Sequence, residues 1–232
     1  MSDRPKQSGL SAWVSGTWAV FEKDLRLELR SRYALNTLLL FVASSLLLVR
    51  VGLGMDVLEP AAEAIVLWLL ILFAAATGLS RAFVAEEERG TRLLLQLHAR
   101  PSCVYAGKLL FNVALTLVLN LAATLAFSIV VDVSVASWGL LMLVVVLGAL
   151  GLAGATTLLS ALIARSSNGG ALFAILAFPV LVPLLVSAVN ATLESFGSGN
   201  PTAVEAELRT LFAYAGTVIT ASTLLFDYVW ND

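Results

Sequence analysis

The sequence has little of the chemistry that enzymes and metal sites use. Among 232 residues there is one cysteine, Cys103, and one histidine, His98, and 13% of the residues are charged. A single cysteine excludes an intramolecular disulfide and the cysteine-rich metal motifs, and a single histidine restricts imidazole chemistry. Residues 1–32 contain no central apolar run, so we expect no cleavable secretory signal.

Charge is also absent from long stretches of the chain. The stretches without Asp, Glu, Lys, Arg or His are 33–49, 64–80, 109–131, 133–164, 166–193 and 210–226. Ion-coupled carriers, and enzymes that work inside the membrane, usually keep ionisable groups at membrane depth. The sequence therefore disfavours a proton-driven carrier, an intramembrane hydrolase and a membrane metal enzyme.

The sequence is rich in apolar residues. Apolar residues make up 59% of the chain and the mean hydropathy is +0.91. A helix needs about 20 residues to cross about 30 Å of hydrocarbon, and apolar flanking residues bring the shorter stretches to that length. We predict an all-α integral membrane protein with a single transmembrane domain over 1–232. Its six predicted spans are about 34–53, 64–83, 108–131, 138–163, 170–193 and 209–228.

The basic residues predict an orientation. With the N-terminus in the cytoplasm, twelve of the fourteen Lys and Arg residues fall in internal segments, and only Arg50 and Arg209 lie outside. Cytoplasmic loops are enriched in Lys and Arg, and the external segments are here acidic instead. We therefore predict that both termini are cytoplasmic.

Apolar residues before the first span recur with helical spacing. Val14, Trp18, Phe21, Leu25 and Leu29 follow one another at steps of three or four, with charged residues between them. This pattern predicts an amphipathic interfacial helix within the cytoplasmic N-terminus 1–32. Two interpretations remain open, a membrane-surface anchor and an elbow helix joined to a transport machine.

The internal segment 84–105, between the second and third spans, contains a cluster of charged and helix-ending residues. They are Glu86, Glu87, Glu88, Gly90 and Thr91. The glycine can end one short helix, and the threonine can cap the next. The segment is either a docking surface for a cytoplasmic partner or a solvated loop. Gly107-Lys108 lacks the rest of a phosphate-binding loop, so an ATPase would be a separate subunit.

Two of the predicted spans carry residues that are unusual in a lipid-facing helix. Asn112, Thr116, Asn120 and Thr124 recur at a strict four-residue step, which favours hydrogen bonds between helices or the lining of a cavity or partner seam. In the fifth span the residues of interest are Gly169, Gly170, Pro179 and Pro183. Prolines four residues apart free backbone carbonyls on one face, so this span is expected to be kinked.

An amphipathic helix, six spans and a docking segment after the second span resemble the permease half of an ABC-2 type exporter. More narrowly, the chain resembles the CcmB family, the haem exporter permeases of cytochrome c maturation. The likeness lies in Phe21-Glu22-Lys23-Asp24-Leu25, in Glu87 to Thr91 with Pro101 and Gly107-Lys108, and in Asn168-Gly169-Gly170 followed by Pro179 and Pro183. In one departure, Arg92-Leu93-Leu94 follows Gly90-Thr91 where the family often has an acidic residue.

The resemblance implies a subunit of the bacterial cytoplasmic (inner) membrane that acts in haem export or in release of a haem-loaded periplasmic chaperone. It implies a CcmA-like ATPase that binds the ATP, a haem-handling CcmC-like subunit, a small CcmD-like subunit and a CcmE-like chaperone. Haem is the candidate cargo. Neither a firmly bound cofactor or metal nor a nucleic-acid partner is expected for this chain.

The resemblance also implies roles for particular residues. An ATPase-docking role falls to Glu86, Glu87, Glu88, Gly90 and Thr91, and a conformational role falls to Gly169, Gly170, Pro179 and Pro183. Two alternatives stay open at this point. They are an ABC-2 type exporter for lipid, glycan or drug, and a membrane scaffold or carrier that works without nucleotide.

Overall fold

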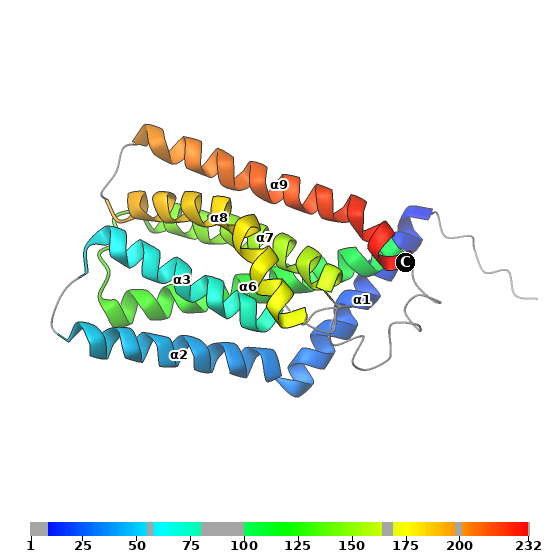
Figure 1. The fold of residues 1–232 in the computed structure, drawn as a ribbon, viewed down its shortest axis with the longest axis horizontal. Coiled ribbons are helices and arrows are strands. Elements are labelled where there is room, and N and C mark those ends of the chain that lie inside the picture. Colours follow the sequence, from blue (N-terminus) through cyan, green and yellow to red (C-terminus); the bar gives the residue numbers. More distant parts are fainter. Residues whose placement is uncertain (1–8, 55–57, 80–99, 164–168, 198–200, 232) are drawn as a thin grey trace, which may run out of the picture.

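A computed structural model describes residues 9–54, 58–79, 100–163, 169–197 and 201–231, and all regular secondary structure within these ranges is helical (Figure 1). The helices are α1 (Gly9–Ser31), α2 (Tyr33–Leu53), α3 (Pro60–Leu79), α6 (Pro101–Val131), α7 (Trp138–Ile163), α8 (Gly169–Ser195) and α9 (Pro201–Asn231). For the described part of the chain, the prediction of an all-α protein is confirmed.

Four of the described helices are long and apolar enough to cross a membrane. These segments are Pro101–Val131, Trp138–Ser160, Leu176–Ser195 and Ala203–Phe226. The apolar parts of α2 and α3 are shorter, at Asn36–Gly52 and Pro60–Ala76. The chain is therefore a multi-pass membrane protein, while the full count of six spans stays a prediction.

The helices α2, α3, α6, α7, α8 and α9 run side by side in one bundle, and α1 lies obliquely across one end of it (Figure 1). The last turns of α9 reach the same end. The most enclosed helix is α7, with 67% of its apolar window buried, and it packs against α6, α8 and α9. Its position makes α7 the centre about which the other helices are arranged.

Three glycines on α7 each accommodate a different neighbour. A Cβ atom on Gly148 would lie 2.2 Å from Cη2 of Trp68 on α3, and one on Gly151 would lie 2.6 Å from Cδ1 of Leu184 on α8. A Cβ on Gly154 would lie 3.0 Å from Cγ1 of Ile219 on α9. Helices in lipid associate mainly through close van der Waals contact, so these missing side chains allow α7 to contact three helices at once.

Polar contacts fix the same packing at two further points. The indole of Trp68 is buried, and its Nε1 donates to Oγ1 of Thr192 on α8 over 2.8 Å. After α6, Asp132 takes a left-handed conformation with φ 62°, which ends the helix. The backbone N–H groups of Ala136 and Ser137 then donate to the carbonyl of Ser195, each over 3.0 Å. The short α6–α7 connection is thus bonded to the end of α8.

We expect Gly148→Ala to destabilise the bundle, because the new methyl group would overlap the Trp68 ring. Overpacking of this kind costs about 1–3 kcal/mol, which a thermal unfolding curve of the detergent-purified protein would register as a lower midpoint. Gly216→Ala on α9 is the matched control, since nothing lies within 4 Å of its Cβ position. Equal midpoints for the two variants would contradict the close packing of α3 on α7.

Candidate functional site

The predicted docking residues do not fall in the described part of the chain. Glu86, Glu87, Glu88, Gly90 and Thr91, and also His98, belong to 80–99, which lies outside the described residues. The description resumes at Arg100, and Pro101 opens α6 at a position where proline suits the first turn of a helix. Of the predicted segment 84–105, residues 100–105 are described, and they lead into and form the first turns of α6.

A buried ion pair joins these turns to α1. The Lys108 side chain is 2% exposed, and its Nζ lies 3.3 Å from Oδ2 of Asp24. The other carboxylate oxygen, Oδ1, lies 3.0 Å from Nζ of Lys23. Removing an ammonium from water is costly unless it is paired, so the contact with Asp24 stabilises the charged lysine in this position.

The glycine before Lys108 allows the two helices to approach. A Cβ on Gly107 would lie 2.6 Å from Cβ of Val20 and 2.8 Å from the backbone oxygen of Thr17. Any larger residue at position 107 would push α1 away from α6 and would separate the two charges. In the pair Gly107-Lys108, the glycine thus provides the space and the lysine provides the charge.

Further contacts extend this interface toward the start of both helices. Nε1 of Trp13 donates to Oγ of Ser102 over 3.2 Å, and Sγ of Cys103 donates to the backbone oxygen of Trp13 over 3.6 Å. We call the whole interface the α1–α6 contact. Its residues are Trp13, Thr17, Val20 and Asp24 on α1 and Ser102, Cys103, Gly107 and Lys108 on α6.

The apolar face predicted for the N-terminal helix lies beside this interface. Val14, Trp18 and Leu29 are exposed, and the ring of Trp18 packs on Phe21 with centroids 5.1 Å apart. The residues that contact α6 are displaced by about one position in sequence. As a result α1 has one face packed on the protein and an adjacent apolar face left uncovered.

On its other side the start of α6 is held by α9. Tyr105 is 1% exposed, its Oη forms a hydrogen bond with Oγ of Ser222, and its ring lies 5.1 Å from that of Phe226. The first turns of α6 therefore lie between α1 and α9. A displacement of these turns would act on both helices.

The four polar residues predicted to line one face of α6 point into this chain. Asn112, Thr116, Asn120 and Thr124 are each at most 3% exposed. Nδ2 of Asn112 donates to Oγ1 of Thr157 on α7 over 2.7 Å, and Oγ1 of Thr116 donates to the backbone oxygen of Asn112 over 2.6 Å. Nδ2 of Asn120 and Oγ1 of Thr124 are buried without a hydrogen-bond partner. In this conformation none of the four is open to contact by a second subunit.

The residues expected to have a conformational role lie on α8. Gly169 and Gly170 are its first two residues, and the exposed Pro179 and Pro183 lie within it. Figure 1 shows α8 bending along its length. Proline has no backbone N–H with which to make the hydrogen bonds of a helix, and this accounts for a bend at such positions. Close to these prolines, Oη of Tyr214 on α9 donates to the backbone oxygen of Val180 over 2.7 Å.

Sequence reasoning missed the pairing of Asp24 with Lys108 and the position of Tyr105. Both charged residues belong to sequence motifs noted above, but 84 positions separate them, and nothing local connects them. The usable signal was a lysine following a glycine at the edge of a long apolar stretch.

Among the described residues, no group of three or more His, Cys, Asp or Glu side chains could hold a metal ion.

We expect the Asp24–Lys108 pair to behave as a unit in a double-mutant cycle. Asp24→Asn and Lys108→Met should each lower the free energy of unfolding. Removal of one partner of a fully buried pair costs about 3–5 kcal/mol, which is an upper value here because Asp24 is 11% exposed. The double variant should be more stable than the sum of the two losses predicts. Glu205→Gln, which breaks the exposed pair with Arg209, is the control and should change little. Additive losses would show that the two residues act independently.

Comparison with known proteins identifies the family of the chain. The model of one protein family, described as CcmB protein, matches residues 15–227, which is most of the chain. The match includes both sides of the Asp24–Lys108 pair and the glycines and prolines of α8. A search of curated proteins finds no match. The chain therefore belongs to the CcmB family, whose members are membrane permease subunits of the haem exporter ABC system of cytochrome c biogenesis.

Proposed function

We propose that this chain is the ABC-2 type permease subunit that converts ATP hydrolysis by a separate subunit into haem export, or into release of a haem-loaded periplasmic chaperone. Family membership supports the class of machine, since it rests on a match over residues 15–227. It also favours this assignment over an exporter of lipid, glycan or drug. The two finer outcomes, haem export and chaperone release, are distinguished by the experiment below.

We propose a topology of six spans with both termini in the cytoplasm. The two shorter helices, α2 and α3, are 21 and 20 residues long, which corresponds to about 30 Å at 1.5 Å per residue. They run beside the four longer helices (Figure 1). The count of basic residues supports the orientation, and it puts α1 and the start of α6 on the cytoplasmic side.

The observation that carries the proposal is the position of the α1–α6 contact. The segment 84–105, which we propose as the docking site of the ATPase, includes Pro101–Tyr105, the first residues of α6. A push on that segment would move the first turns of α6, and the buried Asp24–Lys108 pair would move α1 with them. Through Tyr105 and Ser222 the same movement would reach α9.

From the start of α6 the movement has a route toward the opposite side of the membrane. The bond from Asn112 to Thr157 links α6 to α7, which packs against α8. The prolines of α8, together with Gly169 and Gly170, form the part of the bundle that we propose bends when the helices tilt. Contacts on the periplasmic side would change as a result.

The proposed assembly contains the chain together with a CcmA-like ATPase, a CcmC-like haem-handling subunit, a CcmD-like small subunit and a CcmE-like chaperone, with a second membrane subunit completing the transporter. ATP binds to the ATPase. Haem is the cargo, and we assign no haem ligand to this chain.

The first test is to purify the tagged chain from its native membranes in mild detergent and to identify every protein that accompanies it. We expect an ATPase together with a haem-handling membrane protein, and haem absorbance in the same fraction. An ATPase without any haem protein would favour a general exporter. Recovery of no ATPase would contradict the whole proposal.

The second test concerns docking. Replacing Glu86, Glu87 and Glu88 with glutamine should reduce the amount of ATPase that co-purifies, because the proposed docking surface loses its charges. Glu205→Gln and Glu207→Gln, at the start of α9 on the proposed external side, form the matched control and should leave ATPase recovery unchanged. Equal recovery from both sets would exclude these glutamates as docking residues.

Chaperone release without haem transport would appear as ATP-dependent loss of the chaperone while haem stays on one side of reconstituted vesicles.

A further inference from the structure

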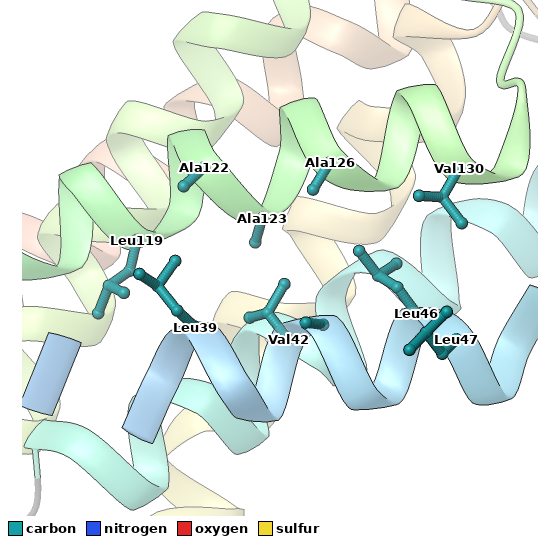
Figure 2. Close-up of a pocket in the computed structure, with 10 residues that line it drawn as sticks. Leu39, Val42, Leu46, Leu47, Leu119, Ala122, Ala123, Ala126 and Val130 are labelled. Atoms are coloured by element: carbon teal, nitrogen blue, oxygen red, sulfur yellow. The ribbon is translucent and has the colours of Figure 1, made fainter. Parts of the chain in front are cut away.

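An apolar groove runs between α2 and α6. Its volume is about 390 Å³, and it is lined by Leu39, Val42, Ala43, Leu46, Leu47, Leu119, Ala122, Ala123, Ala126 and Val130. Figure 2 shows the side chains of the two helices facing each other across it. Val42 and Ala123 are buried at its floor, while Leu39 and Leu47 are half or more exposed at its rim. The groove is therefore open toward the surroundings of the bundle.

Every lining side chain is aliphatic, and this restricts the chemistry of an occupant. No lining residue can ligate iron or pair with a carboxylate, so the groove offers nothing to a haem group. Hydrocarbon is the only chemistry it matches. In a bilayer an empty groove would lose van der Waals contacts on every wall, so hydrocarbon from the membrane is available and favoured there.

The dimensions of the groove select a single chain. From Leu119 to Val130 the groove follows α6 for about 17 Å, which is close to half of the 30 Å hydrocarbon thickness. The volume of about 390 Å³ lies along this length between the aliphatic side chains of only two helices, which suits one extended hydrocarbon chain.

A cation stands at one end of the groove. Arg50 is exposed and lies three and four residues after Leu47 and Leu46, so it continues the same face of α2. One of its nitrogens donates to the backbone oxygen of Gly54, and a guanidinium has further N–H groups with which to bind a phosphate. The groove thus combines an aliphatic channel one leaflet long with a positive charge where a headgroup would lie.

We propose that the α2–α6 groove binds one phospholipid, with an acyl chain between the two helices and the phosphate at Arg50. The lipid fills the gap between the first helix of the bundle and α6, and it holds α2 at its distance from α6. This inference rests on the proposed six-span topology, which puts Arg50 at the membrane surface, and it does not depend on the proposed role in haem export.

The first experiment uses the unmodified chain with its co-purifying partners, reconstituted in nanodiscs of phosphatidylethanolamine and phosphatidylglycerol. A phosphatidylglycerol with a diazirine near the middle of one acyl chain is activated by light, and the labelled peptides are identified by mass spectrometry. We expect labelling to concentrate on 39–47 and 119–130. Exposed apolar residues on α9, such as Phe212 and Leu224, report ordinary lipid contact. Labelling as strong on α9 as in the groove would overturn the proposal.

Two pairs of variants then test the groove and its charge. Ala122→Leu with Ala126→Leu should fill the channel and reduce groove labelling several-fold, while Ala213→Leu on the exposed face of α9 should not. Arg50→Gln should also reduce it, whereas Arg209→Gln, the other predicted external arginine, should not. If the double leucine variant does not fold, the Arg50 pair and the unmodified chain decide the question. Unchanged groove labelling in Arg50→Gln would overturn the proposal.

Discussion

The ion pair between the buried Lys108 and Asp24 is the interaction on which the packing of α1 against the bundle depends. A charge in that position needs its partner, so α1 cannot leave α6 without exposing or stranding the lysine. Gly107 makes the approach possible, since Val20 and the backbone of Thr17 occupy the space that a side chain at position 107 would take. The N-terminal helix is therefore part of the helical assembly, with one face packed on α6 and an adjacent apolar face uncovered.

The remaining helices are subject to a different constraint, because they must associate in lipid, where the surroundings are themselves apolar. Burial of leucine gives little advantage in lipid, so close contact and hydrogen bonding matter more. Three glycines on α7 leave space into which the side chains of Trp68, Leu184 and Ile219 pack from three different helices. The bond between Asn112 and Thr157 adds a polar contact at the same core. A tightly packed central helix of this kind transmits displacement, because it has little room in which to absorb it.

Two features of α6 differ from this close packing and pairing. The side chains of Asn120 and Thr124 are buried without hydrogen-bond partners, and the groove between α2 and α6 is open. These features surround the middle of α6, whose first turns are fixed by α1 and α9. The structure thus combines paired polar contacts at the first turns of α6 with unpaired buried polar atoms and an open groove farther along the same helix.

The sequence by itself determined that this is a helical membrane protein, because apolar runs and helix-ending residues act locally and can be read without knowing any contact. It also determined the family, since the motifs around Asp24, Lys108 and the α8 prolines are strings of residues. Only the tertiary structure decided which face of α1 meets the protein. The apolar repeat through Val14 and Trp18 marks the uncovered face, while Trp13, Thr17, Val20 and Asp24 make the contact. Hydrophobic periodicity records the preference for lipid, whereas helix contact in lipid is decided by shape and by paired charges that lie far apart in the chain.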